Sequence, residues 1–347
     1  MTDQSAGTEP APRSRRRGLR TWSAFGELGR RPTEYEIVTH NLNHTTTGAT
    51  PLLLSPDAHG NRWLIEHRDS SALAVPDWDA FRDPDAVTYG SYVTMQDEQE
   101  TYVEGLLEKF DAEYHDATMP AATLDFLARA MTPTRFLAHG QQMLSAYVQQ
   151  LAPTSYLATA ATFQTADQLR RVQLVSYRTT QLARTHPDRS FGSAERAVWE
   201  QDADWRPVRE AVEHALVEFD WDRALVATQL VVKPVADLLF LDELGRQLAP
   251  AGATLDGMIA ENLARDARRS RHWTGALLRF LADAGESNVK VLQRHLSEWA
   301  PRGHAMVEAG SRLLAGAGGR PAGAIAESVR AGWRDLVAPA GLAMDQL

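Results

Sequence analysis

The chain has 347 residues, of which 44% are hydrophobic and 23% charged, so it has room for one large domain or two small ones with an ample core. Its net charge of −9 argues against a nucleic-acid or anionic-membrane surface, and the lack of cysteine excludes disulfides, thiolate nucleophiles, iron–sulfur clusters and thiolate zinc sites. No apolar run matches a signal peptide or a membrane-spanning helix. We therefore expect a soluble, cytoplasmic protein.

The first 88 residues have little helical periodicity. Residues 1–18 combine Gly, Pro and Ser with several arginines, a composition typical of a disordered, solvated basic tail. Residues 19–88 contain many turn-forming residues together with large aromatic side chains, which are Trp22, Phe25, Tyr35, Trp63, Trp78 and Phe81. Aromatic residues contribute much contact energy per side chain, so we expect an extended N-terminal arm that lies over its own domain or over a neighbouring subunit.

From residue 89 to residue 314 the apolar residues recur at three- and four-residue spacing, which predicts a helical domain. The expected helical elements run from Tyr89 to about residue 118, through the central stretch to His186, from Ala194 to Glu200, from Pro207 to Leu241 with a bend at Pro234, from Leu255 to Ala282, and from Val289 to Leu314. Residues 315–347 form a Gly/Ala-rich C-terminal extension with one weak helix. Because no strand pattern or repeat is present, the fold class is all-α, a helical bundle.

The central stretch Phe136–Ala166 contains no Lys, Arg, Asp or Glu over 31 residues. As a helix it would be ~45 Å long, but glutamines scattered along it argue against a membrane span. Leu137, Leu144 and Leu151 follow a seven-residue helix-packing period. We interpret the stretch as a central helix, kinked or restarted at Pro153. It is either the core helix of a lone domain or, as we favour, a helix covered in part by a partner chain.

The histidines of this sequence do not follow the pattern of a di-iron protein. Helical bundles often bind two irons through one Glu on each of two helices and a Glu-x-x-His pair on each of two more, because this spacing aims carboxylate and imidazole at one metal. The residues three positions before the eleven histidines are Ile37, Asn41, Pro56, Leu64, Ala112, Phe136, Ala183, Ala211, Arg269, Leu292 and Pro301. None is acidic, so we expect no metal ligand, and no nucleotide-binding or hydrolase motif supplies a catalytic residue.

Four features remain, and the first three each have two interpretations. His139 is a metal ligand or, as we favour, a hydrogen-bonded core residue. The acidic cluster at residues 97–100 binds a metal or, more in keeping with its helix, pairs with arginines. The basic run Ala267–Trp273 binds an anion or forms a salt-bridged helix face, the second being favoured. Lys233 lies beside the expected bend, where its ammonium would face a carboxylate of a neighbouring helix.

Six blocks of sequence, in order along the chain, carry a family resemblance. They are RTWSAFGELGRRPTEYEIV (Arg20–Val38), WDAFRDPDAVTYGSYVTMQDEQETYV (Trp78–Val103), QMLSAYVQQLAPTS (Gln142–Ser155), QTADQLRRVQLVSYRTTQL (Gln164–Leu182), FDWDRALVATQLVVKP (Phe219–Pro234) and SRHWTGAL (Ser270–Leu277). The chain resembles the β subunit of the hydroxylase of bacterial multicomponent monooxygenases, in the toluene, alkene and isoprene branch. The resemblance covers residues 20–314 and leaves out both ends.

The resemblance implies a ferritin-like (ribonucleotide-reductase-like) helical bundle lacking metal ligands, with the extended N-terminal arm. In this family the hydroxylase is a dimer of αβγ protomers, and the di-iron centre belongs to the partner α subunit. Electrons derived from NADH arrive through a reductase and a Rieske ferredoxin, and a small effector protein docks on the complex. The complex inserts one atom of O₂ into an alkene or aromatic hydrocarbon.

For this chain the resemblance implies a non-catalytic structural subunit without a cofactor, which pairs with the α and γ subunits and with a second copy of the protomer. The residues expected at subunit interfaces are Trp22, Tyr35, Trp78, Phe81, Tyr89, Tyr92, Gln142, Tyr147, Gln149 and Gln150. The choice of hydrocarbon and its regiochemistry belong to the pocket of another chain. The alternatives are a self-contained helical metalloprotein with an atypical carboxylate site and a helical adaptor unrelated to oxygenases.

Overall fold

The computed structural model describes residues 25, 28–46, 55, 57–316 and 319–344. These residues divide into two units between Val38 and Thr39, and each is described by itself. In the first unit, helix α1 (Glu34–Thr39) begins beside a buried carboxylate: Glu36 accepts hydrogen bonds from the Arg30 guanidinium at 2.8 Å and from the Thr33 backbone N–H at 2.8 Å. This local ion pair fixes the first turn of α1.

The described residues of the second unit contain helices and no strand, so the predicted all-α fold class is confirmed. The helices are α2 (His59–His67), α3 (Tyr89–Ala112), α4 (Ala121–Phe126), α5 (Thr134–Gln150), α6 (Ser155–Thr185), α7 (Glu195–Gln201), α8 (Arg206–Ala215), α9 (Trp221–Leu225), α10 (Lys233–Asp237), α11 (Leu244–Leu248), α12 (Thr254–Ala284), α13 (Glu286–Leu314) and α14 (Ala322–Val337). Helices α7, α12 and α13 begin and end within a few residues of the predicted positions, whereas α2 and α4 were not predicted.

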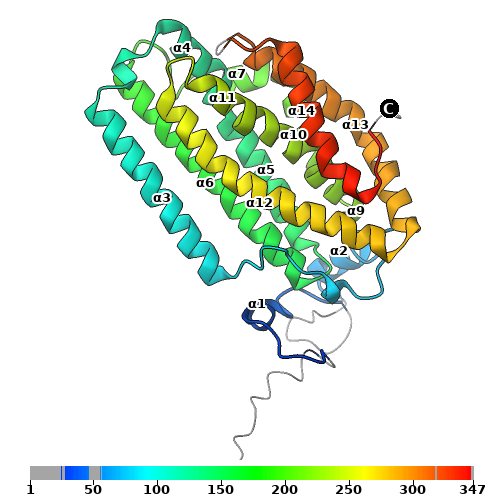
Figure 1. Ribbon diagram of the computed structural model, residues 1–347. Helices are drawn as coiled ribbons and strands as arrows, with labels where there is room; N and C mark the ends of the chain where they lie inside the picture. The colour runs from blue at the N-terminus through cyan, green and yellow to red at the C-terminus, as the bar shows by residue number, and fades with distance from the viewer. Residues whose placement is uncertain (1–24, 26–27, 47–54, 56, 317–318, 345–347) are drawn as a thin grey trace, which may run out of the picture. The chain divides into compact units, whose positions relative to one another are not determined.

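The uncharged central stretch forms a helical hairpin. The predicted break at Pro153 is present, but the chain reverses there, so α5 and α6 run side by side in opposite directions (Figure 1). The Gln164 side chain on α6 donates to Ser145 Oγ on α5 at 2.8 Å. Thr154 caps the first turn of α6, its hydroxyl accepting from the Tyr156 backbone N–H at 3.3 Å. The stretch is therefore two helices that cover each other.

The expected single helix from Pro207 to Leu241 is wrong, because α8 ends at Ala215 and a turn precedes α9. From Trp221 to Leu248 the chain is one continuous helical run, in which α9, α10 and α11 alternate with π-helical segments at 226–232 and 238–243. Pro234 lies two residues after the end of the first π-helical segment, and this local widening accommodates its missing N–H without ending the helix. By length and composition the run could cross a membrane, yet 94% of its most apolar window is buried, as in a core helix.

Four long helical elements enclose the interior of the second unit. The hairpin α5–α6, the run α9–α11 and α12 pack around it, while α13 and α14 lie on the side away from α3 (Figure 1). Helix α3 lies at one edge, where Val103, Leu106 and Phe110 join an apolar cluster with residues of α6 and α12. This burial fixes the C-terminal half of α3.

The segment before α3 lies over helices of its own chain. Asn288 on α13 accepts from the Ala74 backbone N–H at 3.0 Å and donates to the Ala74 carbonyl at 2.9 Å. Trp78 packs edge-on against Trp221, with ring centroids 5.3 Å apart. Between the two alternatives left open by the sequence, this part of the aromatic-rich region therefore covers its own domain.

The C-terminal helix α14 is more firmly packed than its composition indicates. Trp333 is fully buried, and its Nε1–H donates to the carbonyl of Leu230 at 2.5 Å. Ser328 donates to the buried carboxylate of Glu243 at 2.7 Å, which also pairs with Arg320. The one helix expected in this region is present as α14, and it packs into the core.

Gly303 lets α13 approach α14, which leads to a stability prediction. A Cβ at Gly303 would lie 2.8 Å from Trp333 Cζ2 and 2.9 Å from Val231 Cγ1. We expect Gly303→Ala to lower the free energy of unfolding by ~1–3 kcal/mol, because overpacking outweighs the helix propensity of Ala. Gly105→Ala is the control, since nothing lies within 4 Å of that position on α3. Urea denaturation of both variants measures the difference, and equal effects would contradict this packing argument.

Candidate functional site

The interior of the four-helix unit contains a cluster of charged side chains. On α10, the Lys233 ammonium lies 2.5 Å from Asp237 Oδ2, and on α6 the Arg171 guanidinium lies 3.5 Å from Asp237 Oδ1. The side chains of Asp237, Arg171 and Lys233 are exposed by 0%, 2% and 3%. The sequence-based expectation that Lys233 pairs with a neighbouring helix is wrong: its partner lies one turn along the same helix.

Arg171 connects three helices through this cluster. Its guanidinium also donates to Gln141 Oε1 on α5 at 3.5 Å and to the Phe240 carbonyl at 3.4 Å. These contacts are long, and burial lowers the pKa of Arg171 while Asp237 opposes that effect. The carboxylate of Asp237 therefore provides most of the charge that stabilises the two buried cations, Arg171 and Lys233.

This donor set does not fit a pair of iron ions. A di-iron site of the usual kind needs four carboxylates and two imidazoles facing one another, whereas the cluster offers one carboxylate beside a guanidinium and an ammonium. Across the described residues, no group of three or more His, Cys, Asp and Glu side chains is placed to hold a metal ion. The two cations would repel a metal, and the arrangement suits electrostatic cross-linking of helices.

A second ion-pair network joins α3 to α6 and α12. Arg269 on α12 lies 2.5 Å from Asp167 on α6, and Arg170 on α6 lies 3.0 Å from Asp266 on α12. Glu100 on α3 pairs with Arg170. For Glu100, the favoured interpretation of the acidic cluster, pairing with arginine, is therefore confirmed.

The basic run on α12 forms salt bridges, as the favoured interpretation has it. Besides the Arg269 pair, Arg271 lies 3.4 Å from Asp242 and His272 Nδ1 lies 3.0 Å from Asp85 Oδ1. The burial of Asp242 raises the pKa of its carboxyl, and Arg271 opposes that shift. His139, by contrast, is exposed on α5, so it is neither a core residue nor placed in the interior as a ligand.

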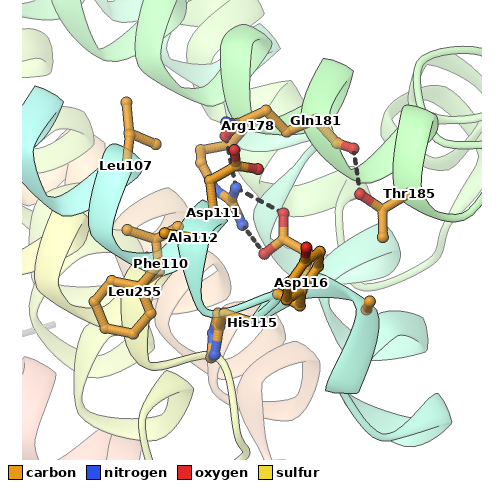
Figure 2. Close-up of a pocket in the computed structure, with 12 residues that line it drawn as sticks. Leu107, Phe110, Asp111, Ala112, His115, Asp116, Arg178, Gln181, Thr185 and Leu255 are labelled. Atoms are coloured by element: carbon orange, nitrogen blue, oxygen red, sulfur yellow. Dashed lines mark hydrogen bonds and ion pairs between the residues drawn. The ribbon is translucent and has the colours of Figure 1, made fainter.

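A cavity of about 260 Å³ lies where the end of α3 meets the end of α6 (Figure 2). Arg178 holds two carboxylates there: its Nη2 lies 2.9 Å from Asp116 Oδ1 and its Nε lies 2.8 Å from Asp256 Oδ1. Burial disfavours the charged form of Arg178, but the two carboxylates outweigh it and raise its pKa. The charged groups of Arg178, Asp116 and Asp256 thus form ion pairs with one another, which indicates a structural connection between the end of α3, α6 and α12.

The residues predicted at subunit interfaces do not converge on one site. Trp22 lies outside the described residues. Tyr35 and Phe81 are buried, whereas Tyr89 is 76% exposed and Gln150 is also exposed. The remaining predicted residues are partly exposed, namely Trp78, Tyr92, Gln142, Tyr147 and Gln149.

Two of the partly exposed tyrosines also have partners inside the chain. Tyr147 accepts a hydrogen bond from Trp63 Nε1–H at 3.1 Å and donates to the Phe219 carbonyl at 2.7 Å, while Tyr92 donates to Asp167 at 3.0 Å. The sequence reasoning missed the buried charges of α6. Their signal was present, because Asp167, Arg171 and Arg178 occupy inward positions four and seven residues apart.

Comparison with known proteins identifies the family. Residues 63–285 match the family model described as methane/phenol/alkene hydroxylase, which covers more than half of the chain. The chain belongs to this family. Its described residues share the helical fold of the family's solved structures, as the resemblance implied.

Two curated relatives are hydroxylase subunits. The chain is 37% identical to the β subunit of the hydroxylase component of the toluene-4-monooxygenase system of Ectopseudomonas mendocina, over 85% of this chain and 90% of the relative. It is 27% identical to the small subunit of the hydroxylase component of propane 2-monooxygenase of Mycolicibacterium smegmatis, over 87% of this chain and 82% of the relative.

Two solved structures match the fold closely. A chain of toluene 4-monooxygenase with toluene bound in its resting active site superposes with a TM-score of 0.80 at 35% identity, covering 90% of this chain and 100% of that one. A chain of phenol hydroxylase from Pseudomonas sp. OX1 also gives a TM-score of 0.80, at 20% identity, covering 98% and 99%. The second match shows the fold alone.

The core cluster makes a prediction about the free energy of unfolding. Asp237→Ala leaves two buried cations without their carboxylate, so we expect a loss of ~3–5 kcal/mol. The control is Asp125→Ala, which removes an exposed partner of Arg189 and is expected to cost less than ~1 kcal/mol. Urea denaturation followed by circular dichroism measures both. The electrostatic interpretation of the core would be wrong if the two losses were alike.

Proposed function

We propose that this chain is the non-catalytic structural β subunit of the hydroxylase of a soluble di-iron monooxygenase with (αβγ)₂ composition. The observation that carries the proposal is the interior cluster, in which Arg171 and Lys233 flank a single carboxylate, Asp237. Its relatives are subunits of monooxygenase hydroxylases, and the chain spans 90% of the toluene 4-monooxygenase β subunit. A chain of this fold with cations in its interior is suited to supporting a catalytic subunit.

In this proposal the di-iron centre lies in a partner α subunit, and this chain holds no cofactor. The complex oxygenates alkenes or aromatic hydrocarbons with O₂ and NADH-derived electrons, supplied through a reductase and a ferredoxin, while an effector protein acts on the hydroxylase. The complex acts in the cytoplasm, and the chain contacts neither nucleic acid nor membrane. Its own residues contribute by holding the helices in place.

The domain division belongs to the proposal as well. Residues 1–18 act as a basic tail, residues 19–88 as an aromatic-rich arm, residues 89–314 as a ferritin-like helical domain and residues 315–347 as a C-terminal extension. Among the described residues of the arm, the stretch that contains Ala74 and Trp78 packs against helices of its own chain. The earlier part is proposed to contact neighbouring subunits.

The outer face of α5 is the proposed contact with a partner subunit. Met143 and Gln150 are exposed there, Gln142 and Gln149 are partly exposed, and α5 carries no charged residue after Arg135. A charge-free surface loses little on leaving water, because it has no ion to desolvate. Depletion of charge at the core of an interface is the compositional signal that distinguishes it from other surface.

The metal-free role predicts a simple result for the isolated chain. Purified alone, it should bind no stoichiometric iron by elemental analysis and oxidise no hydrocarbon, because its interior lacks the carboxylate and imidazole set. Omitting it from the reconstituted hydroxylase should abolish activity. A content of about two irons per chain would overturn the proposal in favour of a self-contained metalloprotein.

The interface assignment predicts an effect of a single added charge. We expect Gln150→Glu, a substitution of nearly equal size, to weaken binding of the α subunit by tenfold or more, because desolvating an unpaired carboxylate costs several kcal/mol. Gln173→Glu makes the same change at an exposed position of α6, outside the charge-free stretch, and should alter binding little. Light scattering and binding titrations of the purified subunits compare the two. Unchanged binding by Gln150→Glu would remove α5 from the interface.

A further inference from the structure

The N-terminal half of α3 is held to the bundle in an unusual way. None of the ten residues from Tyr89 to Glu98 is buried, and only Tyr92, Met95 and Gln96 are partly covered. The C-terminal half, in contrast, places Val103 and two further apolar residues in the cluster shared with α6 and α12. The first ten residues of α3 therefore depend on polar contacts.

Those contacts converge on two buried carboxylates. The Gln96 side-chain amide donates to Asp167 on α6 at 3.2 Å and to Asp266 on α12 at 3.0 Å, so a single amide nitrogen bridges both. Tyr92 donates to Asp167 at 3.0 Å, and Gln99 donates to Asp266 at 3.2 Å. We call these five residues the α3 clasp.

Tyr92 occupies the centre of the apolar side of the clasp. Its ring is stacked on the ring of Phe163 on α6, with the two centroids 4.5 Å apart. The guanidinium of Arg269 on α12 lies 5.3 Å from the centroid of the Tyr92 ring. Arg269 therefore touches both the ring of Tyr92 and the carboxylate of Asp167. Any change in the charge of Asp167 acts on the residue that fixes the start of α3.

The charges around the clasp do not balance. Three carboxylates, those of Asp167, Asp266 and Glu100, face two guanidinium groups, those of Arg170 and Arg269. Two buried carboxylates that share one amide donor repel each other unless one takes up a proton. We propose that the α3 clasp is a proton-sensitive device, in which protonation of Asp167 holds the N-terminal half of α3 on the bundle and its deprotonation loosens that half.

The titration of Asp167 is consistent with this geometry. Burial, together with the neighbouring carboxylate of Asp266, raises the pKa of Asp167 to about 7, while Arg269 and Tyr92 act in the opposite direction. A raised pKa means that the docked state binds a proton that the undocked state releases. Docking is therefore strengthened as the pH falls through 7 and weakened as it rises.

The groups that face Asp167 come from every element packed around it. Tyr92 from α3 and Asp266 and Arg269 from α12 act on Asp167 directly. Arg170 from α6 and Glu100 from α3 are linked to it through Asp266, and Asp83 from the segment before α3 through Arg269. Burial raises the pKa of Asp83 as well, and Arg269 opposes that shift. All these groups lie within one chain, so the proposal does not depend on the assignment of partner subunits.

Hydrogen–deuterium exchange of the full-length chain in its native assembly tests the clasp. Protection factors of the amides in Tyr89–Glu98, corrected for intrinsic exchange, should fall about tenfold between about pH 6 and about pH 8, as a native pKa of about 7 requires. In the Asp167→Asn variant, whose side chain keeps a hydrogen-bond acceptor but cannot ionise, these protection factors should stay high at both pH values. Asp202→Asn, which alters an ion pair with Arg129 elsewhere on the surface, should behave like the wild type.

Infrared difference spectra supply a second readout, which reports protonation directly and does not depend on amide exchange. The C=O stretch of a protonated carboxylic acid should appear as the pH is lowered through about 7, and it should be missing in Asp167→Asn. Wild-type protection factors that are equal at both pH values would overturn the proposal. So would an Asp167→Asn variant that keeps the wild-type pH dependence.

Discussion

The structure depends on pairing the charges that helix α6 carries into the interior. An ionised side chain taken out of water costs several kcal/mol unless an opposite charge meets it, and α6 buries Asp167, Arg170, Arg171 and Arg178. Each pairs with a residue outside α6: Asp167, Arg170 and Arg178 with α12, Arg171 with α10, and Arg178 also with the turn after α3. These pairs favour the observed packing of α6 against α3, α10 and α12, because separating the helices would leave buried charges without a partner.

This constraint also bears on what the chain does within its family. A carboxylate-rich interior is neutralised by metal ions in di-iron proteins, whereas here a guanidinium and an ammonium neutralise Asp237. In the part of the chain that the structure describes, this interior cluster is thus held together by side chains of the chain itself. A subunit of this kind adds rigidity and surface to an assembly, and its surface helix α5 has no charge over its last fifteen residues.

Much of the fold could be predicted because helical periodicity is a local signal. The start of α3 at Tyr89 and the end of α6 before His186 follow from it directly. The reversal at Pro153 could not be predicted, since a proline among small residues suits a kink and a turn equally well. The break after Ala215 was missed because apolar spacing continues through the turn. The buried ion pairs were also out of reach: Arg178 and Asp256 are 78 positions apart, and pattern alone does not match such partners.

The α5–α6 hairpin has a consequence for how the chain acquires its structure. Its two helices are joined by a connection of four residues, so closing it costs little chain entropy, and it can form while α10 and α12 are still being synthesised. Before α10 packs against the hairpin, the inward face of the hairpin carries Gln141, Gln164 and Arg171. These polar side chains remain hydrated until Asp237 of α10 pairs with Arg171. A nascent bundle with a polar inner face resists the premature self-association that an exposed apolar hairpin would invite.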